Sequence, residues 1–303
     1  MNSFIQANTD GRLHDAAEPS ISPLNRGFLY GDAVYEVWRT HAGVVFAFDE
    51  HWQRLERSAQ ALYLNHGLSR ERLCSEMQRT ARAFREQTGE RGELYVRLQV
   101  TRGAGRIGLD ISLATEPSWV VLVQALPRPA LPAGRAGLRL QVAQGLRRNP
   151  VDALDPAWKT GNYLNNLLCL REARAAGADE VLMLNRAGCL TEAAVSNVFF
   201  VRRGVLVTPP LSAGILGGVT RALILQRVAA QAGLEAREED VHPERLGEFE
   251  ECFLSSTTRD TAAVEAVGAQ RFVVGPTSVT ARLQSAFSAY TAEYARQHPE
   301  LAL

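Results

Sequence analysis

Lysine is nearly absent from this sequence of 303 residues. The 33 basic residues are 32 arginines and a single lysine, Lys159, in the stretch DPAWKTGNYLNNLL at 155–168. A guanidinium stays charged at any working pH, whereas a lysine amine can lose its proton and become a nucleophile. The single lysine is either an accident of codon usage or a position where arginine fails. Its place between Trp158 and a turn that leads into an apolar helix favours the second interpretation, a lysine that forms an imine with a carbonyl compound.

An excess of one charge and long apolar runs are also missing. The 33 acidic residues balance the 33 basic ones without a charged block, which argues against a nucleic-acid-binding or membrane-surface protein. No apolar run approaches the roughly 18 residues that span a bilayer, and the first residues lack the apolar segment of a signal peptide. We therefore expect a cytoplasmic protein whose partner is a small molecule.

Cysteine is scarce. Cys74, Cys169, Cys189 and Cys252 stand far apart and form no CxxC pair, and the histidines do not show metal-ligand spacing. This pattern predicts reduced core thiols and no metal site.

Strand and helix patterns are present in the first half of the chain. Residues 49–62 predict a helix with Asp49 as its N-cap, and 93–101 and 118–126 predict strands. The stretch PRPALPAGRA at 127–136 contains three prolines and Gly134 and predicts an interdomain linker. We expect a domain over 1–126 and a second domain over 137–303.

The second half also mixes strands and helices. Two helices are predicted, over 162–177 and 219–233, each ending at a glycine. Strands are predicted at 137–145, 180–185, 195–201, 204–209 and 251–256, with a turn over 186–194. Because regular βαβ alternation is missing, the pattern indicates an α+β (α/β) fold rather than a doubly wound sheet.

Pyridoxal phosphate is the cofactor that usually accompanies a lysine imine in amino-group chemistry, and it makes further demands. Gly217 and Gly218 precede a predicted helix whose N-terminus and Thr220 hydroxyl suit a phosphate, although two glycines also make an ordinary tight turn. Glu192 suits the pyridine nitrogen. Among small and apolar neighbours it needs a partner, and the alternative is an ordinary turn residue paired with an arginine. Tyr163, four residues after the lysine, suits the phenolic oxygen.

Several motifs resemble, in order and spacing, the class IV (fold type IV) pyridoxal-phosphate aminotransferases. They are RGFLYGDAVYEVWRTHAGVVFAFDEHWQRLERSA, KTGNYLNNLL, LTEAAVSNVFFV, GILGGVTR and CFLSSTTRDTAAV. The family includes branched-chain aminotransferases, D-amino acid transaminases, R-selective amine transaminases and aminodeoxychorismate lyase. The resemblance covers most of residues 20–270. It implies a small N-terminal α/β domain, a larger C-terminal domain with a barrel-like sheet, the cofactor between them, and a homodimer.

The resemblance also implies roles for single residues. Lys159 is the Schiff-base lysine and proton shuttle, Glu192 pairs with the pyridine nitrogen and Tyr163 with the phenolic oxygen. Leu216 packs against the ring. The phosphate contacts are Arg54, the backbone at Val219 and Thr220, and Thr257. Arg57, one turn after Arg54, is expected on a solvated helix face.

The substrate motifs resemble two different groups of the family, the D-amino acid transaminases and the branched-chain aminotransferases. Arg106 matches the carboxylate-binding position of D-amino acid transaminases, but the histidine expected two residues later is Gly108. Tyr95 and Arg97 match the carboxylate pocket of branched-chain enzymes, although the proline that usually follows is Leu98. Strand alternation puts Tyr95 and Arg97 on one face, which can also be an exposed strand face. Tyr30, Tyr35 and Glu36 match the substrate-side strand of the family, and Thr258 completes the predicted substrate-binding set.

Together these features predict a pyridoxal-phosphate-dependent transaminase that moves an amino group from an amino donor to a 2-oxo acid by a ping-pong mechanism. Two alternatives remain. An aminodeoxychorismate lyase would use the same cofactor to eliminate pyruvate. A protein that binds the cofactor without turnover would not need the proton shuttle that Lys159 provides.

Overall fold

The computed structural model describes residues 4–127 and 131–303, so part of the predicted linker 127–136 lies outside the described residues. The chain divides into two compact units. The first comprises Met1–Arg128, Trp158–Asn162 and Thr291–Leu303, and the second Pro129–Ala157 and Tyr163–Tyr290. The predicted domains 1–126 and 137–303 stay a prediction. They differ from the compact units in the assignment of 158–162 and 291–303.

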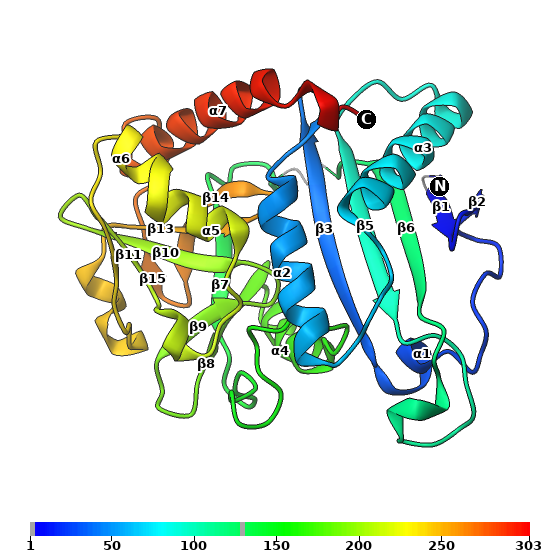
Figure 1. Cartoon of the computed structure of the whole chain (residues 1–303). Helices are drawn as coiled ribbons and strands as arrows, with labels where there is room; N and C mark the ends of the chain where they lie inside the picture. The colour runs from blue at the N-terminus through cyan, green and yellow to red at the C-terminus, as the bar shows by residue number, and fades with distance from the viewer. Residues whose placement is uncertain (1–3, 128–130) are drawn as a thin grey trace. The chain divides into compact units, whose positions relative to one another are not determined.

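The first unit is built on a six-stranded sheet with the order β2-β1-β6-β5-β3-β4, in which neighbouring strands run antiparallel (Figure 1). The strands are β1 Gln6–Thr9, β2 Arg12–Asp15, β3 Ala33–His41, β4 Val44–Val45, β5 Leu94–Thr101 and β6 Ser118–Ala125. The predicted strands 93–101 and 118–126 are therefore confirmed. Two long helices, α2 Phe48–Ala61 and α3 Arg70–Thr88, belong to this unit.

Buried and partly exposed side chains alternate along the strands, so that one face of the sheet belongs to the core and the other does not. Trp38 on β3 and Val96 and Leu98 on β5 are buried in one cluster with Leu55 of α2 and Met77 of α3. Because successive side chains of a strand point to opposite faces, the intervening residues lie on the other face of the sheet.

The predicted helix 49–62 is confirmed as α2 Phe48–Ala61, but its N-cap lies two residues earlier than predicted. The helix begins at Phe48 after Ala47, whose φ is 52°, and Asp49 lies in the first turn instead of at the N-cap. An acidic side chain is still favourable there because the first turn carries the positive end of the helix dipole. The start of α3, for which no helix was predicted, has a conventional cap, since the Ser69 side chain accepts a hydrogen bond from the backbone of Arg72.

Shorter elements complete the first unit. They are α1 Arg26–Tyr30, the 3-10 turns η1 Ile111–Leu113 and η5 Pro299–Leu301, and the last residues of α7 Val279–Gln297. Residues 158–162 lie along β3, because the backbone nitrogen of Tyr35 donates to the carbonyl of Lys159 and Val34 forms an isolated bridge with Thr160.

The second unit contains a nine-stranded mixed sheet with the order β12-β11-β10-β13-β14-β7-β8-β9, and β15 pairs with β14. The strands are β7 Leu138–Val142, β8 Glu180–Leu184, β9 Leu190–Ala193, β10 Asn197–Arg202, β11 Val205–Thr208, β12 Ala236–Glu238, β13 Glu251–Ser256, β14 Asp260–Val267 and β15 Gln270–Arg271. The end strand β9 comes back into contact with β10, so the sheet curls into a partial barrel. The predicted fold class, including the barrel-like sheet, is confirmed.

Helices of the second unit begin close to the predicted positions. They are α4 Leu164–Ala175, the 3-10 turns η2 Leu211–Ala213 and η4 Pro243–Glu248, and a run of α5 Val219–Leu223, the π-helical turn η3 Ile224–Val228 and α6 Ala229–Gln231. The first residues of α7 also belong here. As predicted, the run that starts at Val219 ends before a glycine, Gly233, with a φ of 63°.

The predicted turn over 186–194 is too long. Residues 190–193 form the buried strand β9, in which Leu190 pairs with Leu184 and Ala193 with Leu182 of β8. Only the residues before β9 make the turn, where the backbone of Gly188 donates to the carbonyl of Asn185. The apolar side chains at 190 and 193 are buried because these residues pair with β8. In the sequence they follow directly after turn-forming residues, so the local pattern did not predict a strand there. Among the described residues, no helix is both long and apolar enough to cross a membrane.

Candidate active site

Lys159 lies beside the strand β3 and the helix α2. Its backbone nitrogen donates to Ser58 Oγ at 3.1 Å. Its Nζ donates to the hydroxyl of Tyr35 at 3.4 Å and lies 4.4 Å from the centroid of the Tyr35 ring. The backbone of the lysine is therefore fixed on two sides, by α2 and by β3, while its amine rests on an aromatic face.

The same ring carries a second cation. The guanidinium carbon of Arg97 lies 3.9 Å from the centroid of the Tyr35 ring, and Arg97 Nη2 donates to Gln99 Oε1 at 2.8 Å. The register pairs Tyr35 with Gln99 and Arg39 with Tyr95, so Tyr95 and Arg97 share one sheet face, as predicted. This face therefore brings together an amine, a guanidinium and two tyrosines.

Arg54 is not on a solvated helix surface. Its Nε donates to Glu36 Oε1 at 2.7 Å and its Nη2 to Glu36 Oε2 at 2.9 Å, and both side chains are buried. His51 Nδ1 lies 2.8 Å from Glu36 Oε2. Arg57, in contrast, is exposed, as predicted. The bidentate pair fixes the orientation of the Arg54 guanidinium.

Electrostatics of this cluster follow from burial and charge. Burial alone would raise the pKa of Glu36, but the charge and hydrogen bonds of Arg54, with a smaller effect of His51, hold it far below its ordinary value. Burial lowers the pKa of His51, and although Glu36 opposes this, the charges of Arg54 and Lys159 lower it further. At neutral pH the cluster is therefore a carboxylate, a guanidinium and a neutral imidazole.

One of the three residues predicted for the substrate-side strand lies elsewhere. Tyr30 belongs to the helix α1, not to a strand, because Gly31 ends α1 in a left-handed conformation before β3 begins. Glu36 lies on the strand but on the face opposite to Tyr35, where it binds Arg54. The placement of Tyr30 corrects the prediction, whereas Glu36 lies on the strand as predicted, and the role of Tyr30 in substrate binding stays untested.

Arg106 is exposed in the loop between β5 and β6. Arg26 Nη1 donates to the carbonyl of Gly108 at 2.8 Å, and the backbone nitrogen of Gly108 donates to the hydroxyl of Tyr30 at 3.1 Å. The loop that carries Arg106 is thus attached to α1, in the same unit as Tyr35 and Lys159.

In the second unit, Glu192 is a buried carboxylate with several donors. Arg148 Nε donates to its Oε1 at 2.8 Å, and its Oε2 accepts from Asn197 Nδ2 at 3.3 Å and from the backbone of Leu216 at 3.1 Å. The expectation that this carboxylate needs a partner is confirmed. The partner is an arginine, as in the alternative interpretation, but Glu192 lies on the strand β9 and not in a turn. The donors come from three separate segments and hold the carboxylate in one orientation.

The segment after Leu216 has the geometry of an anion-binding helix start. Gly218 precedes α5 without a side-chain cap, so the first N–H groups at Val219 and Thr220 receive no side-chain acceptor from the cap residue. A Cβ on Gly218 would lie 2.0 Å from Asn197 Oδ1, which explains the glycine. Of the remaining predicted residues, Tyr163 immediately precedes α4, and Thr257 and Thr258 lie between β13 and β14.

The donor types of each unit fit pyridoxal phosphate. The first unit carries an amine and a fixed arginine, and the second carries a helix start without a side-chain cap and an anchored carboxylate, which are the groups that the aldehyde, phosphate and pyridine nitrogen of the cofactor require. Within 4–127 and 131–303, no three His, Cys, Asp or Glu side chains are grouped so that they could hold a metal ion.

Sequence reasoning did not find four contributing residues. Arg148 and Asn197 bind Glu192, while His51 and Ser58 bind Glu36 and the Lys159 backbone. The only available signal was the spacing of His51, Arg54 and Ser58 on the buried face of one helix. Arg148 lies 44 residues from Glu192 and carried no local signal.

Comparison with known proteins identifies relatives over most of the chain. The model of the amino-transferase class IV family matches residues 33–267. A protein of Methanocaldococcus jannaschii assigned as a branched-chain-amino-acid aminotransferase is 36% identical over 84% of this chain and 85% of its own length. The D-alanine aminotransferase of Bacillus licheniformis is 30% identical over 91% of this chain and 94% of its own.

A lyase is also among the relatives, since the aminodeoxychorismate lyase of Bacillus subtilis is 29% identical, covering 82% of both chains. Among solved structures, the branched-chain aminotransferase of Thermoproteus uzoniensis with norvaline superposes with a TM-score of 0.86 at 28% identity, covering 98% of both chains.

Proposed function

The chain belongs to the class IV aminotransferases, and from this membership we propose that it moves an amino group between an amino acid and a 2-oxo acid in a ping-pong cycle. Pyridoxal 5′-phosphate is the cofactor. The observation that supports an amino acid as substrate is the Tyr35 ring, which contacts the amine of Lys159 and the guanidinium of Arg97. An α-amino acid needs both a reacting amine and a cation for its carboxylate.

The cofactor, when bound, supplies an aldehyde that exchanges amino groups and a ring that accepts electrons from the substrate carbon. In this proposal Lys159 attaches to the aldehyde, Glu192 binds the pyridine nitrogen and Tyr163 the phenolic oxygen. Leu216 packs on the ring. The phosphate is bound by Arg54, by the backbone of Val219 and Thr220, and by Thr257.

Lys159 also moves the proton. Once the substrate amino group has taken its place, the free Nζ removes the proton from the substrate α-carbon and later returns it on the way to the product. Tyr35 orients Nζ through the contact at 3.4 Å. Glu192, held by Arg148 and Asn197, keeps its negative charge directed at one point throughout the cycle.

For the substrate we propose that Arg97 and Tyr95 bind the α-carboxylate. Arg97 is already oriented by Gln99 and by the Tyr35 ring, so little order is lost when a carboxylate arrives. Arg106, Tyr30 and Thr258 are proposed as further substrate contacts. Branched-chain L-amino acids and D-amino acids both stay open as donors.

The visible absorbance of the cofactor-loaded protein tests this proposal and selects the donor. L-Leucine, D-alanine and an R-amine are added separately, and each reaction is followed by a 2-oxo acid. We expect one donor to bleach the yellow band and the oxo acid to restore it. A band that no donor changes would contradict transamination, and a Lys159→Ala variant that still turns over without added amine would contradict the role of Lys159.

The lyase is the competing function, and the relative in Bacillus subtilis is the reason to test it. Incubation with aminodeoxychorismate and no amino acceptor separates the two activities. Pyruvate release together with an unchanged band in the donor experiment would favour the lyase, whereas a transaminase should release none under these conditions.

We also propose that the protein is a cytoplasmic homodimer with domains over 1–126 and 137–303. Support for an interface comes from exposed apolar side chains on α1 and the loop attached to it, since Phe28, Ile107 and Leu109 are each more than two-thirds exposed. Light scattering during size-exclusion chromatography measures the mass, and a monomer at micromolar concentration would contradict the dimer.

A further inference from the structure

A pocket of about 450 Å³ lies in the first unit and shares no lining residue with the candidate active site. It is formed by the second half of α3, the turn that leads to β5 and the segment 299–303. Its volume falls within the range of small-molecule sites, roughly 300–1,000 Å³.

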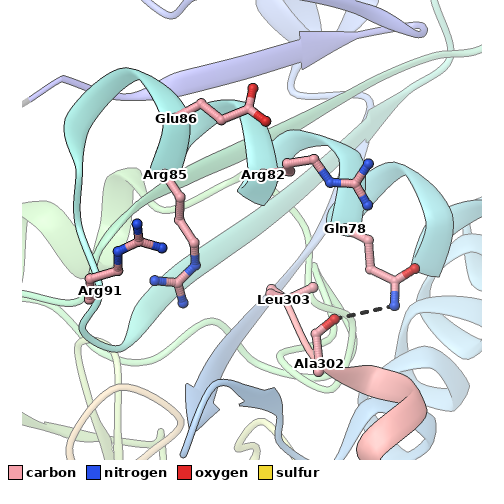
Figure 2. A pocket seen from close by; sticks show the side chains of 7 residues that line it. All are labelled: Gln78, Arg82, Arg85, Glu86, Arg91, Ala302 and Leu303. Atoms are coloured by element: carbon pink, nitrogen blue, oxygen red, sulfur yellow. Dashed lines mark hydrogen bonds between the residues drawn. The ribbon is translucent and has the colours of Figure 1, made fainter.

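Three arginines dominate the lining. Figure 2 shows Arg82 and Arg85 projecting from α3 and Arg91 from the following turn, with Leu303 between them. Glu86 is the single acidic residue of the lining, and in Figure 2 its carboxylate is directed away from Arg85 and Arg91. Three positive side chains and one negative side chain therefore line the pocket.

Arg85 is held in place by the backbone. Its Nη1 donates to the carbonyl of Glu90 at 3.0 Å and its Nη2 to the carbonyl of Gly92 at 3.4 Å. Its Nε is buried and has no hydrogen-bond acceptor in the described part of the chain. The two carbonyl contacts therefore fix the Arg85 side chain against the turn before β5.

The guanidinium groups of Arg82 and Arg91 make no hydrogen bond or ion pair with any residue of 4–127 or 131–303, although the backbone nitrogen of Arg91 donates to Glu90 Oε1 at 2.9 Å. Arginines nearer the start of the same helix behave differently, because Arg79 pairs with Glu76 at 2.8 Å and Arg70 with Asp49 at 2.5 Å. The end of α3 thus concentrates positive charge that this unit does not neutralise with acidic side chains.

The other wall of the pocket is fixed as well. Gln78 Nε2 donates to the carbonyls of Glu300 at 3.0 Å and Ala302 at 3.2 Å, the second of which is drawn in Figure 2. The backbone nitrogen of Leu303 donates to the carbonyl of Gly43 at 2.9 Å. A ligand would therefore meet a preformed wall with an apolar side chain, which reduces the entropy lost on binding.

We propose that this pocket binds a small anion that carries two or more negative charges, either as phosphate groups or as several carboxylates. Guanidinium groups bind both kinds of oxyanion through paired hydrogen bonds, and an anion among three guanidiniums also relieves their mutual repulsion. The pocket is an accessory site, and the proposal does not depend on the transaminase activity.

Calorimetric titration of the full chain tests the proposal. The protein is loaded with pyridoxal phosphate and freed of excess by gel filtration, so that the probe cannot occupy the cofactor site. Sodium pyrophosphate is the first probe and citrate the second, at low and at raised salt. The pocket variant carries both Arg82→Gln and Arg91→Gln. The control variant carries both Arg57→Gln and Arg171→Gln, which also removes two exposed arginines. Arg85 is left intact because it shapes the turn.

We expect the wild type to bind with a dissociation constant below about 1 mM, and the pocket variant to bind at least about tenfold more weakly, since each lost charge-assisted hydrogen bond contributes over about 1 kcal/mol. The control variant should stay within about twofold and raised salt should weaken binding. Tighter binding of pyrophosphate assigns the ligand to phosphates, and tighter binding of citrate to carboxylates. Equal affinity of the two variants, or no wild-type binding of either probe at about 10 mM, would overturn the proposal.

Discussion

Glu36 is a residue whose chemistry depends entirely on its neighbours. It is fully buried, and its charge is tolerated because Arg54 and His51 bind both carboxylate oxygens. The cluster holds the guanidinium of Arg54, which we propose as a phosphate contact, in one buried orientation. The same cluster makes stability depend on pH.

We predict that Glu36→Gln makes the free energy of unfolding smaller and less dependent on acid. The folded pKa of Glu36 is held below its ordinary value of 4.5, so the folded state binds fewer protons and the stabilisation is complete above about pH 4.5 and lost as the pH falls below it. Removing one partner of a buried pair costs roughly 3 kcal/mol at neutral pH. Urea unfolding between about pH 6 and pH 3 measures both effects.

Glu172→Gln, on the exposed surface of α4, is the matched control. It should change neither the free energy of unfolding at neutral pH nor the loss of that free energy in acid by more than about 0.5 kcal/mol. If the wild type and Glu36→Gln lost stability in acid with the same slope, the assigned charge state of Glu36 would be wrong.

Arg148 is the corresponding residue of the second unit. We predict that Arg148→Gln destabilises the protein by roughly 3 kcal/mol because it leaves Glu192 buried without its cation. It should also change the absorbance titration of the bound cofactor, since Glu192 would lose the donor that orients its carboxylate. Arg147→Gln next to it removes an exposed arginine and should affect neither urea unfolding nor the absorbance titration. Equal behaviour of the two variants would exclude a role of Arg148 in orienting Glu192.

At the scale of elements, the helix start at Gly218 joins three features. The glycine precedes α5, it lies against Asn197, and Asn197 Nδ2 donates to Glu192 and to the carbonyl of Leu216. The start of α5 and the Glu192 carboxylate are thus positioned by one amide side chain.

We predict that Gly218→Ala displaces Asn197 and lowers both stability and cofactor affinity. The added Cβ would lie 2.0 Å from Asn197 Oδ1, and overpacking of this kind costs about 1–3 kcal/mol. Urea unfolding of the cofactor-free protein and titration with pyridoxal phosphate measure the two effects. Gly217→Ala is the neighbouring control for stability, because its nearest non-neighbouring atom would be 3.8 Å away. A Gly218→Ala protein as stable as the control would show that Asn197 moves at no cost.

On the scale of the whole molecule, the near absence of lysine becomes an experimental tool. Every basic side chain except Lys159 is an arginine, which does not form a stable adduct with an aldehyde under the conditions used for lysine. Side-chain labelling with pyridoxal phosphate should therefore report on a single position.

We predict that pyridoxal phosphate followed by borohydride adds one cofactor per chain, located at Lys159 by peptide mapping. Lys159→Ala is the control and should retain at most labelling of the chain's terminal amine. Cofactor attached elsewhere in the wild type, or equal labelling of the two proteins, would contradict the assignment of the reactive amine.

Much of the architecture follows from local sequence. The strand patterns in residues 93–101 and 118–126 predict β5 and β6, and the apolar pattern before Gly233 predicts the helical run from Val219. These predictions work because a strand or helix expresses its periodicity within a few residues. The sequence likewise determined that Lys159 is the only side-chain amine, and its motifs identified the family.

Only the tertiary structure decided which residues meet. It brought Arg148 to Glu192 and Glu36 to Arg54, placed the Arg97 guanidinium on the Tyr35 ring, and paired 190–193 with β8 as a strand. The physical reason is that a buried charge must find a partner, but the partner's position depends on strand register and chain path across tens of residues. Local periodicity contains no information about that path.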